Sequence, residues 1–89
     1  MITSDQIRAA RALLRWSSAQ LSESSGVGTS TIKRLEVMEG VPSGHVRTIV
    51  AIKEALESAG VEFIGSPTGN PGVRLKTTGF SKIKARGKD

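Results

Sequence analysis

The sequence predicts one small, mainly α domain of four to five helices, followed by a β-hairpin and a basic tail. Helix-start signals and apolar residues at helical spacing recur between residues 3 and 59. Two short β-prone runs follow within residues 61–76, and residues 77–89 are rich in glycine, lysine and arginine. With 89 residues and a hydrophobic fraction of 37%, the chain can form only a modest core.

Composition narrows the class of protein. The chain has no cysteine, so neither a disulfide framework nor a thiolate metal site can hold it together. No apolar run approaches the roughly 20 residues that cross a bilayer, and we therefore expect a soluble cytoplasmic protein without a membrane partner. The net charge of +5 favours polyanions. Much of this charge lies in residues 77–89, where four basic side chains stand against Asp89.

A helix is predicted from the first turn after Thr3 to about Trp16. Thr3 and Gln6 have the spacing of a capping box, in which each side chain bonds the backbone N–H of the other residue. We expect Trp16 to pack between helices rather than to bind a ligand. The inward side of this helix is expected to carry Ile7, Ala10, Leu13 and Leu14.

Two shorter helices follow. Ser17 and Gln20 repeat the capping-box spacing, and Gly26 can take the left-handed conformation that ends a helix. A third helix should begin after Gly28, which supplies no side-chain acceptor as a cap, and should run to Glu36.

A fourth helix is predicted from a cap at Ser43 or Gly44 to about Ala59, with Val46, Ile49, Val50, Ile52 and Leu56 on its apolar side. Residues 61–64 and 73–75 are predicted strands, joined by a long loop over residues 65–72. The predicted domain organisation is therefore 1–60 for the helices, 61–76 for the hairpin and 77–89 for a disordered basic tail.

The stretch from Ser17 to Glu36 has a specific register. Apolar residues form a seam between two helices, a small residue allows them to cross closely, and a glycine permits the sharp turn. These positions are Leu21, Ser22, Gly26, Val27, Ile32 and Leu35. Over roughly residues 3–59 the sequence resembles the Cro/XRE-type helix-turn-helix family, whose members have the lambda-repressor-like fold. Ser18, Ser22 and Gly28 depart from the residues usual in that family.

The resemblance implies a transcriptional regulator, expected to be a repressor, whose third helix enters the major groove of double-stranded DNA at an operator. It implies base readout by Thr29, Ser30, Lys33 and Arg34. Phosphate contacts would come from Ser17, Ser18, Ser43, His45 and Arg47. It also implies a structural ion pair between Arg11 and Glu36.

The sequence offers less support for functions other than DNA binding. His45 is the only histidine, so no metal site, catalytic set or cofactor site can be assembled, and we expect no enzyme activity. The hairpin carries more apolar surface than two strands can bury, which predicts a homodimer built through residues 61–76; the alternative is a hairpin folded onto its own helices. A second function stays open, namely a DNA-binding antitoxin or neutralising subunit whose hairpin binds a protein.

Overall fold

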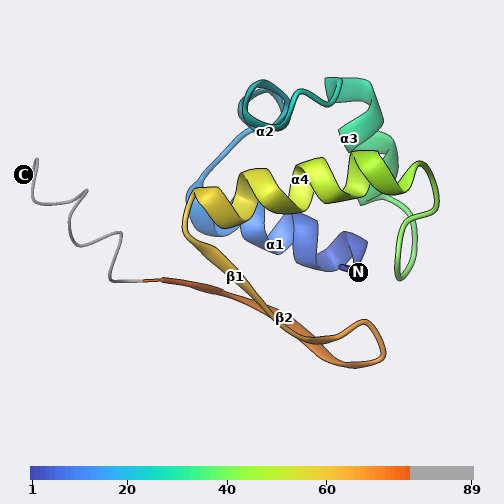
Figure 1. Cartoon of the computed structure of the whole chain (residues 1–89), viewed down its shortest axis with the longest axis vertical. Coiled ribbons are helices and arrows are strands. Elements are labelled where there is room, and N and C mark those ends of the chain that lie inside the picture. The colour runs from blue at the N-terminus through green and yellow to red at the C-terminus, as the bar shows by residue number, and fades with distance from the viewer. Residues whose placement is uncertain (77–89) are drawn as a thin grey trace, which may run out of the picture.

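The computed structural model describes residues 1–76, and these form four helices and one antiparallel hairpin (Figure 1). The helices are α1 (Ser4–Leu14), α2 (Ser18–Ser25), α3 (Thr29–Glu36) and α4 (Val46–Ser58), and the strands are β1 (Val61–Ser66) and β2 (Gly69–Leu75). The prediction of a mainly α chain with a hairpin is confirmed at this level. The tail predicted for residues 77–89 lies outside the described residues. Within residues 1–76, no helix is long and apolar enough to cross a membrane.

The first two helices begin where local signals predicted. The Thr3 hydroxyl accepts from the Gln6 N–H at 3.0 Å, and the Thr3 N–H donates to Gln6 Oε1 at 2.8 Å. Ser17 and Gln20 form the same box at 3.1 and 2.8 Å. Helix α2 ends at Gly26, whose φ of +79° is in the left-handed region. Both boxes are properties of four consecutive residues, which is why the sequence alone identified them.

The fourth helix starts later than predicted. Its cap is His45 rather than Ser43 or Gly44, and no side-chain hydrogen bond closes its first turn. Gly44 has a φ of +152°, which is incompatible with a helix-cap geometry, so the turn continues through it. The buried side of α4 carries Ile49, Ile52 and Leu56.

The core lies between α2 and the base of the hairpin, and all four helices and the start of β1 contribute side chains to it. Ten apolar side chains are buried there: Ile2, Ile7, Ala10, Leu21, Ile32, Leu35, Ile49, Ile52, Leu56 and Val61. Three residues predicted to face inward do not: Leu13 and Val50 are each 40% exposed, and Val46 is 65% exposed. Helical periodicity placed them beside the buried stripe, but neighbouring helices cover only its centre.

The hairpin is longer and its turn shorter than predicted. Val61 pairs with Leu75 and Phe63 with Val73, and pairing continues to Ser66 and Gly69, so only two residues connect the strands. A bulge between Ile64 and Ser66 contains Gly65, with a φ of +74°. The glycines and prolines of residues 65–72 suggested a loop, but both strands of a two-stranded sheet are edges, where proline is tolerated.

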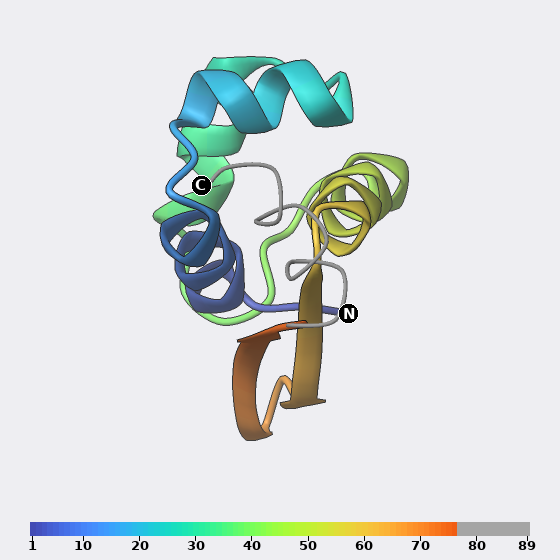
Figure 2. The same ribbon diagram turned by 90° about the vertical axis from the view of Figure 1, so that its left-hand side faces the viewer.

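The base of the hairpin packs on the helices, while its tip extends away from them at the end opposite α2 (Figures 1 and 2). Val61 is fully buried, and Phe63, Val73 and Leu75 pack against the core; Ile64 remains 37% exposed. The helices of the same chain thus cover most of the apolar surface that suggested a dimer.

One side chain joins the first helix to the hairpin. Gln6 Nε2 donates to the Ile64 carbonyl at 3.2 Å and to the Gly72 carbonyl at 2.9 Å, while its Oε1 serves the Thr3 cap. Both N–H groups of the Gln6 side-chain amide thus donate to carbonyls of the strands. The start of α1 and the two strands therefore form one packed unit.

Candidate nucleic-acid interface

Helices α2 and α3 are joined by a turn of three residues, Gly26 to Gly28, and pack against each other. Leu21 of α2 and Ile32 and Leu35 of α3 are buried in the common core, and Ser22 and Val27 are partly buried. The five non-glycine residues expected to form the seam between the two helices are therefore all buried or partly buried. Gly28 caps α3 without a side-chain hydrogen bond.

An ion pair fixes α3 to α1. Arg11 Nε donates to Glu36 Oε2 at 2.8 Å and Arg11 Nη2 donates to Glu36 Oε1 at 2.9 Å, so the pair is bidentate. Arg11 Nη1 also donates to the Trp16 carbonyl at 2.9 Å. The Glu36 side chain is only 7% exposed. Hydrogen bonding to this carboxylate raises the pKa of Arg11 above its ordinary value, which shows that the carboxylate favours the charged guanidinium.

The opposite side of α3 is uncovered. Ser30, Lys33 and Arg34 are exposed, and Thr29, the first residue of the helix, is partly buried. The helix thus has an anchored face, which carries Ile32, Leu35 and Glu36, and a free face that presents a hydroxyl and two cations. Thr29 contributes less to that free face than the sequence prediction assumed.

The remaining predicted side chains, except Ser43, lie at the starts of α2 and α4. Ser17 is exposed, but its hydroxyl already accepts the Gln20 N–H, and Ser18 is partly buried. His45 and Arg47 are exposed at the first turn of α4. Ser43 lies before the cap of α4, with its hydroxyl 3.9 Å from Met38 Sδ, and so is not part of that helix start.

A cleft of about 420 Å³ joins the free face of α3 to the start of α4. Its walls include Arg34 and His45, which the sequence assigned to different roles, and two threonines that the sequence prediction missed, Thr31 and Thr48. Thr31 lies three residues before Arg34, and Thr48 three residues after His45, so helical spacing was the signal that could have identified both.

Basic side chains without an ion-pair partner occur on α3 and at the start of α4, and one of them, Arg34, lines the cleft. Within residues 1–76, Arg8, Arg11, Lys53 and Arg74 pair with carboxylates. The basic side chains of that segment for which no ion pair forms are Arg15, Lys33, Arg34, Arg47 and Lys76. Three of these five lie on α3 or in the first turn of α4. Exposed cations on these two neighbouring segments favour binding of a polyanion.

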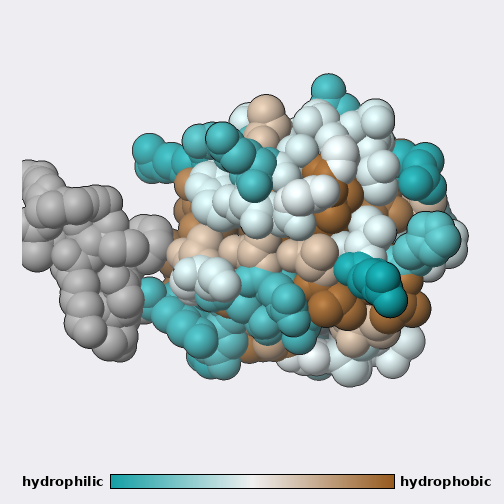
Figure 3. Space-filling model, turned by 45° about the horizontal axis from the view of Figure 1, so that its top comes forward, coloured by the Kyte–Doolittle hydropathy of each residue, from teal (hydrophilic) through white to brown (hydrophobic). Residues whose placement is uncertain are grey.

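The exposed surface seen when the upper side of Figure 1 is turned forward is mostly polar or intermediate in hydropathy, with smaller apolar patches between (Figure 3). No group of three or more histidine, cysteine or acidic side chains that could hold a metal ion occurs in the described part of the chain. Comparison of the chain with protein-family models and with curated protein sequences finds no match.

Proposed function

We propose that this protein binds double-stranded DNA through a helix-turn-helix formed by α2 and α3 and regulates transcription from an operator, as a repressor. The observation that carries this proposal is the two-sided character of α3. One face is locked to α1 by the bidentate Arg11–Glu36 pair, and the other leaves Ser30, Lys33 and Arg34 exposed. The resemblance of residues 3–59 to Cro/XRE-type regulators supports the same function, which would be exercised on the nucleoid in the cytoplasm.

Base readout is assigned to the free face of α3. An α-helix fits the major groove, and a guanidinium can donate two hydrogen bonds to O6 and N7 of guanine. Arg34 has no carboxylate partner among residues 1–76, so DNA binding would not have to break an existing ion pair. Ser30 and Thr29 are short enough to contact either kind of base, and Lys33 is placed for the wall of the groove.

Phosphate binding is assigned to the two helix starts beside α3. The first turns of α2 and α4 present backbone N–H groups, and the helix dipoles favour an anion there. His45 and Arg47 add side-chain donors at α4, and Ser17 and Ser18 lie at α2. Such contacts orient the protein on DNA but do not select a sequence.

A selection of bound sites from a random pool of duplex DNA tests the proposal first. Enrichment of one sequence is the expected result. Arg34→Ala should then lower discrimination at one base pair by about 1–3 kcal/mol, because one bidentate contact is lost. Lys76→Ala removes the same charge from the end of β2 and should leave discrimination unchanged. Failure of the pool to enrich any sequence would refute sequence-specific binding.

The proposed assembly is a homodimer, which would set two recognition helices about 34 Å apart, one turn of DNA. Ile64 and the unpaired edges of the hairpin are the features of residues 61–76 left for a partner, since Val61 is buried in the chain's own core. A palindromic selected site and a dimer mass in sedimentation are expected. A monomer mass at micromolar concentration, with and without DNA, would contradict the dimer.

A further inference from the structure

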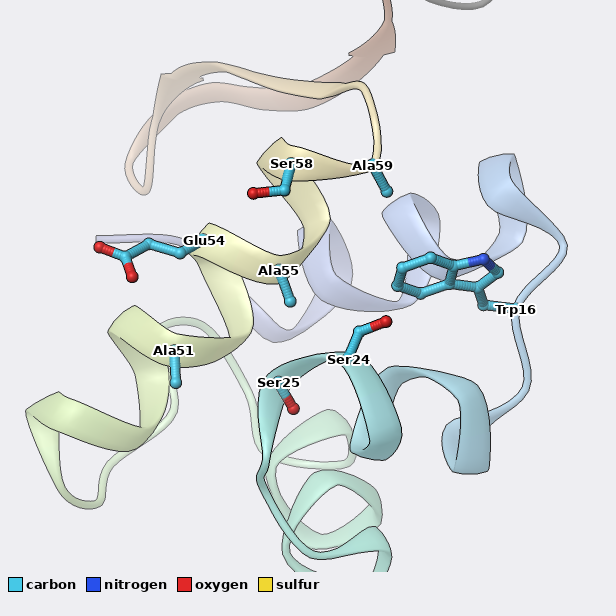
Figure 4. A pocket seen from close by; sticks show the side chains of 8 residues that line it. All are labelled: Trp16, Ser24, Ser25, Ala51, Glu54, Ala55, Ser58 and Ala59. Atoms are coloured by element: carbon cyan, nitrogen blue, oxygen red, sulfur yellow. The ribbon is translucent and has the colours of Figure 1, made fainter. Parts of the chain in front are cut away.

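A second hollow, a groove of about 500 Å³, lies between α2 and α4 and includes none of the residues assigned to DNA (Figure 4). We call it the α2–α4 groove. Its lining consists of Trp16, Ser24, Ser25, Ala51, Glu54, Ala55, Ser58 and Ala59. Trp16 stands at one end, near Ala59, and Glu54 lies towards the other (Figure 4).

Both helices line the groove with small side chains. On α4, Ala51, Ala55 and Ala59 recur every four residues and so lie on one face, while α2 contributes two serines. One wall therefore offers apolar surface and a tryptophan ring that is only partly buried.

Glu54 is the single charged residue of the lining. It makes no ion pair with any residue of the described segment, whereas Glu57, on the same helix, pairs with Lys53 at 3.2 Å. A free carboxylate and an indole ring in one groove suit a ligand that combines a cation with an aromatic or aliphatic group. The lining of this groove therefore carries one negative charge and no positive one.

The end of β2 lies beside this groove. The Lys76 N–H donates to the Gly60 carbonyl at 2.8 Å, and Gly60 directly follows Ala59, a lining residue next to Trp16. Lys76, the last residue that the structure describes, therefore lies close to the Ala59 end of the groove. Residues 77–89 could extend about 40 Å at roughly 3.3 Å per residue. The stretch from Ala51 to Ala59, the C-cap of α4, spans only about 12 Å.

Residues 77–89 combine apolar and basic side chains, which complement the tryptophan and the carboxylate of the groove lining. The segment contains Phe80 and Ile83 among its basic residues, Lys82, Lys84, Arg86 and Lys88. We propose that residues 77–89 of the same chain bind in the α2–α4 groove, with an apolar side chain against Trp16 and a basic side chain at Glu54. Because the segment is tethered next to the site, the entropy lost on binding is small compared with that of a free peptide. This inference is independent of DNA binding.

Trp16 is the only tryptophan of the chain, so its fluorescence reports on the groove directly. In the full chain, Phe80→Ser and Glu54→Gln should each shift Trp16 emission to longer wavelength and increase quenching by acrylamide. Glu57→Gln is the matched control, since it removes the same charge from α4 outside the groove lining. Spectra and quenching identical to the parent chain in both test variants would overturn the proposal.

A chain ending at Lys76 provides a second measurement. It keeps every buried residue of the core, so it should retain helical circular dichroism while Trp16 becomes more accessible to acrylamide. Adding a synthetic peptide of residues 77–89 should restore the shielding. Shielding in the full chain that disappears on dilution would assign the groove to a second copy and overturn the intramolecular form. Unchanged Trp16 accessibility after truncation would overturn it entirely.

Discussion

At the scale of single residues, the polar side chain of Gln6 is buried and links the cap of α1 to the hairpin. Its amide closes the cap of α1 and also bonds two carbonyls of the hairpin, and the residue is only 4% exposed. Gln20 occupies the same place in the cap of α2 but is exposed and has no strand beside it. Both glutamines close a capping box, but only Gln6 is buried against the hairpin. Comparing substitutions at the two positions therefore measures the contribution of the bonds to the hairpin.

Gln6→Glu should lower the free energy of unfolding by about 2 kcal/mol at pH 7, because a buried carboxylate would face two carbonyl oxygens. Burial would raise the pKa of the introduced carboxyl above its unfolded value. Its neutral form would therefore persist in the folded state, and the loss should shrink as the pH falls towards 4. Urea unfolding at several pH values checks this.

Gln20→Glu is the control for that experiment. Glutamate is equally suited to the third position of a capping box, so the change in stability should stay within about 0.5 kcal/mol. Equal losses for the two variants would show that the bonds from Gln6 to the hairpin contribute nothing.

Arg11 and Glu36 are the second residue-scale feature, and they belong to the proposed site because they hold α3 in place. Arg11→Ala should destabilise the fold by about 2 kcal/mol, less than for a fully buried pair because Arg11 is 23% exposed. Lys53→Ala, which breaks an exposed pair, should cost at most about 0.5 kcal/mol. Replacing both Arg11 and Glu36 by Met should recover most of the loss, as measured by urea unfolding.

At the scale of elements, the turn between α2 and α3 contains two glycines with opposite requirements. Gly26 has a φ of +79° and Gly28 a φ of −60°, and a Cβ at either position would meet nothing within 4 Å. Any difference between substitutions therefore comes from the backbone rather than from crowding.

Gly26→Ser should cost about 1 kcal/mol, because an L residue is strained in the left-handed region. Gly28→Ser should instead gain a few tenths of a kcal/mol, since the hydroxyl can accept a hydrogen bond from the first turn of α3. Thermal unfolding of the two variants gives the comparison. Shifts of the same sign would mean that the turn relaxes into another conformation.

The elements also show how far local sequence signals reach. The caps at Thr3 and Ser17 and the end at Gly26 were predicted because each depends on neighbouring residues. The start of α4 was not, because serine, glycine and histidine all stand near it and only the tertiary fold selects among them. The contacts of Gln6 with residues 64 and 72 leave no trace in any local pattern.

The residues of the free face of α3 were expected from the resemblance to helix-turn-helix regulators, and burial of Ile32 and Leu35 leaves Lys33 and Arg34 outside. The cleft that joins Arg34 to His45 and Thr48 was not predicted, since it depends on how α4 crosses α3. The sequence thus indicated single helices, the seam between α2 and α3 and the Arg11–Glu36 pair, but not the cleft between α3 and α4.

At the scale of the whole molecule, the unpaired basic side chains should determine how DNA binding depends on salt concentration. If Arg47 contacts a phosphate, Arg47→Ala should reduce the slope of log K against log salt concentration by about 0.9, because one fewer counterion is released. Lys53→Ala removes an equal charge from a paired site further along α4 and should leave the slope unchanged. Titrations of the selected duplex at several salt concentrations measure both. Equal slopes for the two variants would place the phosphate contact elsewhere.

The bond between Gln6 and Gly72, which joins positions 66 apart, also bears on how the chain acquires its fold during synthesis. The first helix is made first, but its buried amide finds its last partner only when the second strand has left the ribosome. Contacts between distant positions slow folding, because loop closure must precede them. We therefore expect the helices to remain incompletely packed on the nascent chain and to become stable together, in one late step, once β2 has emerged.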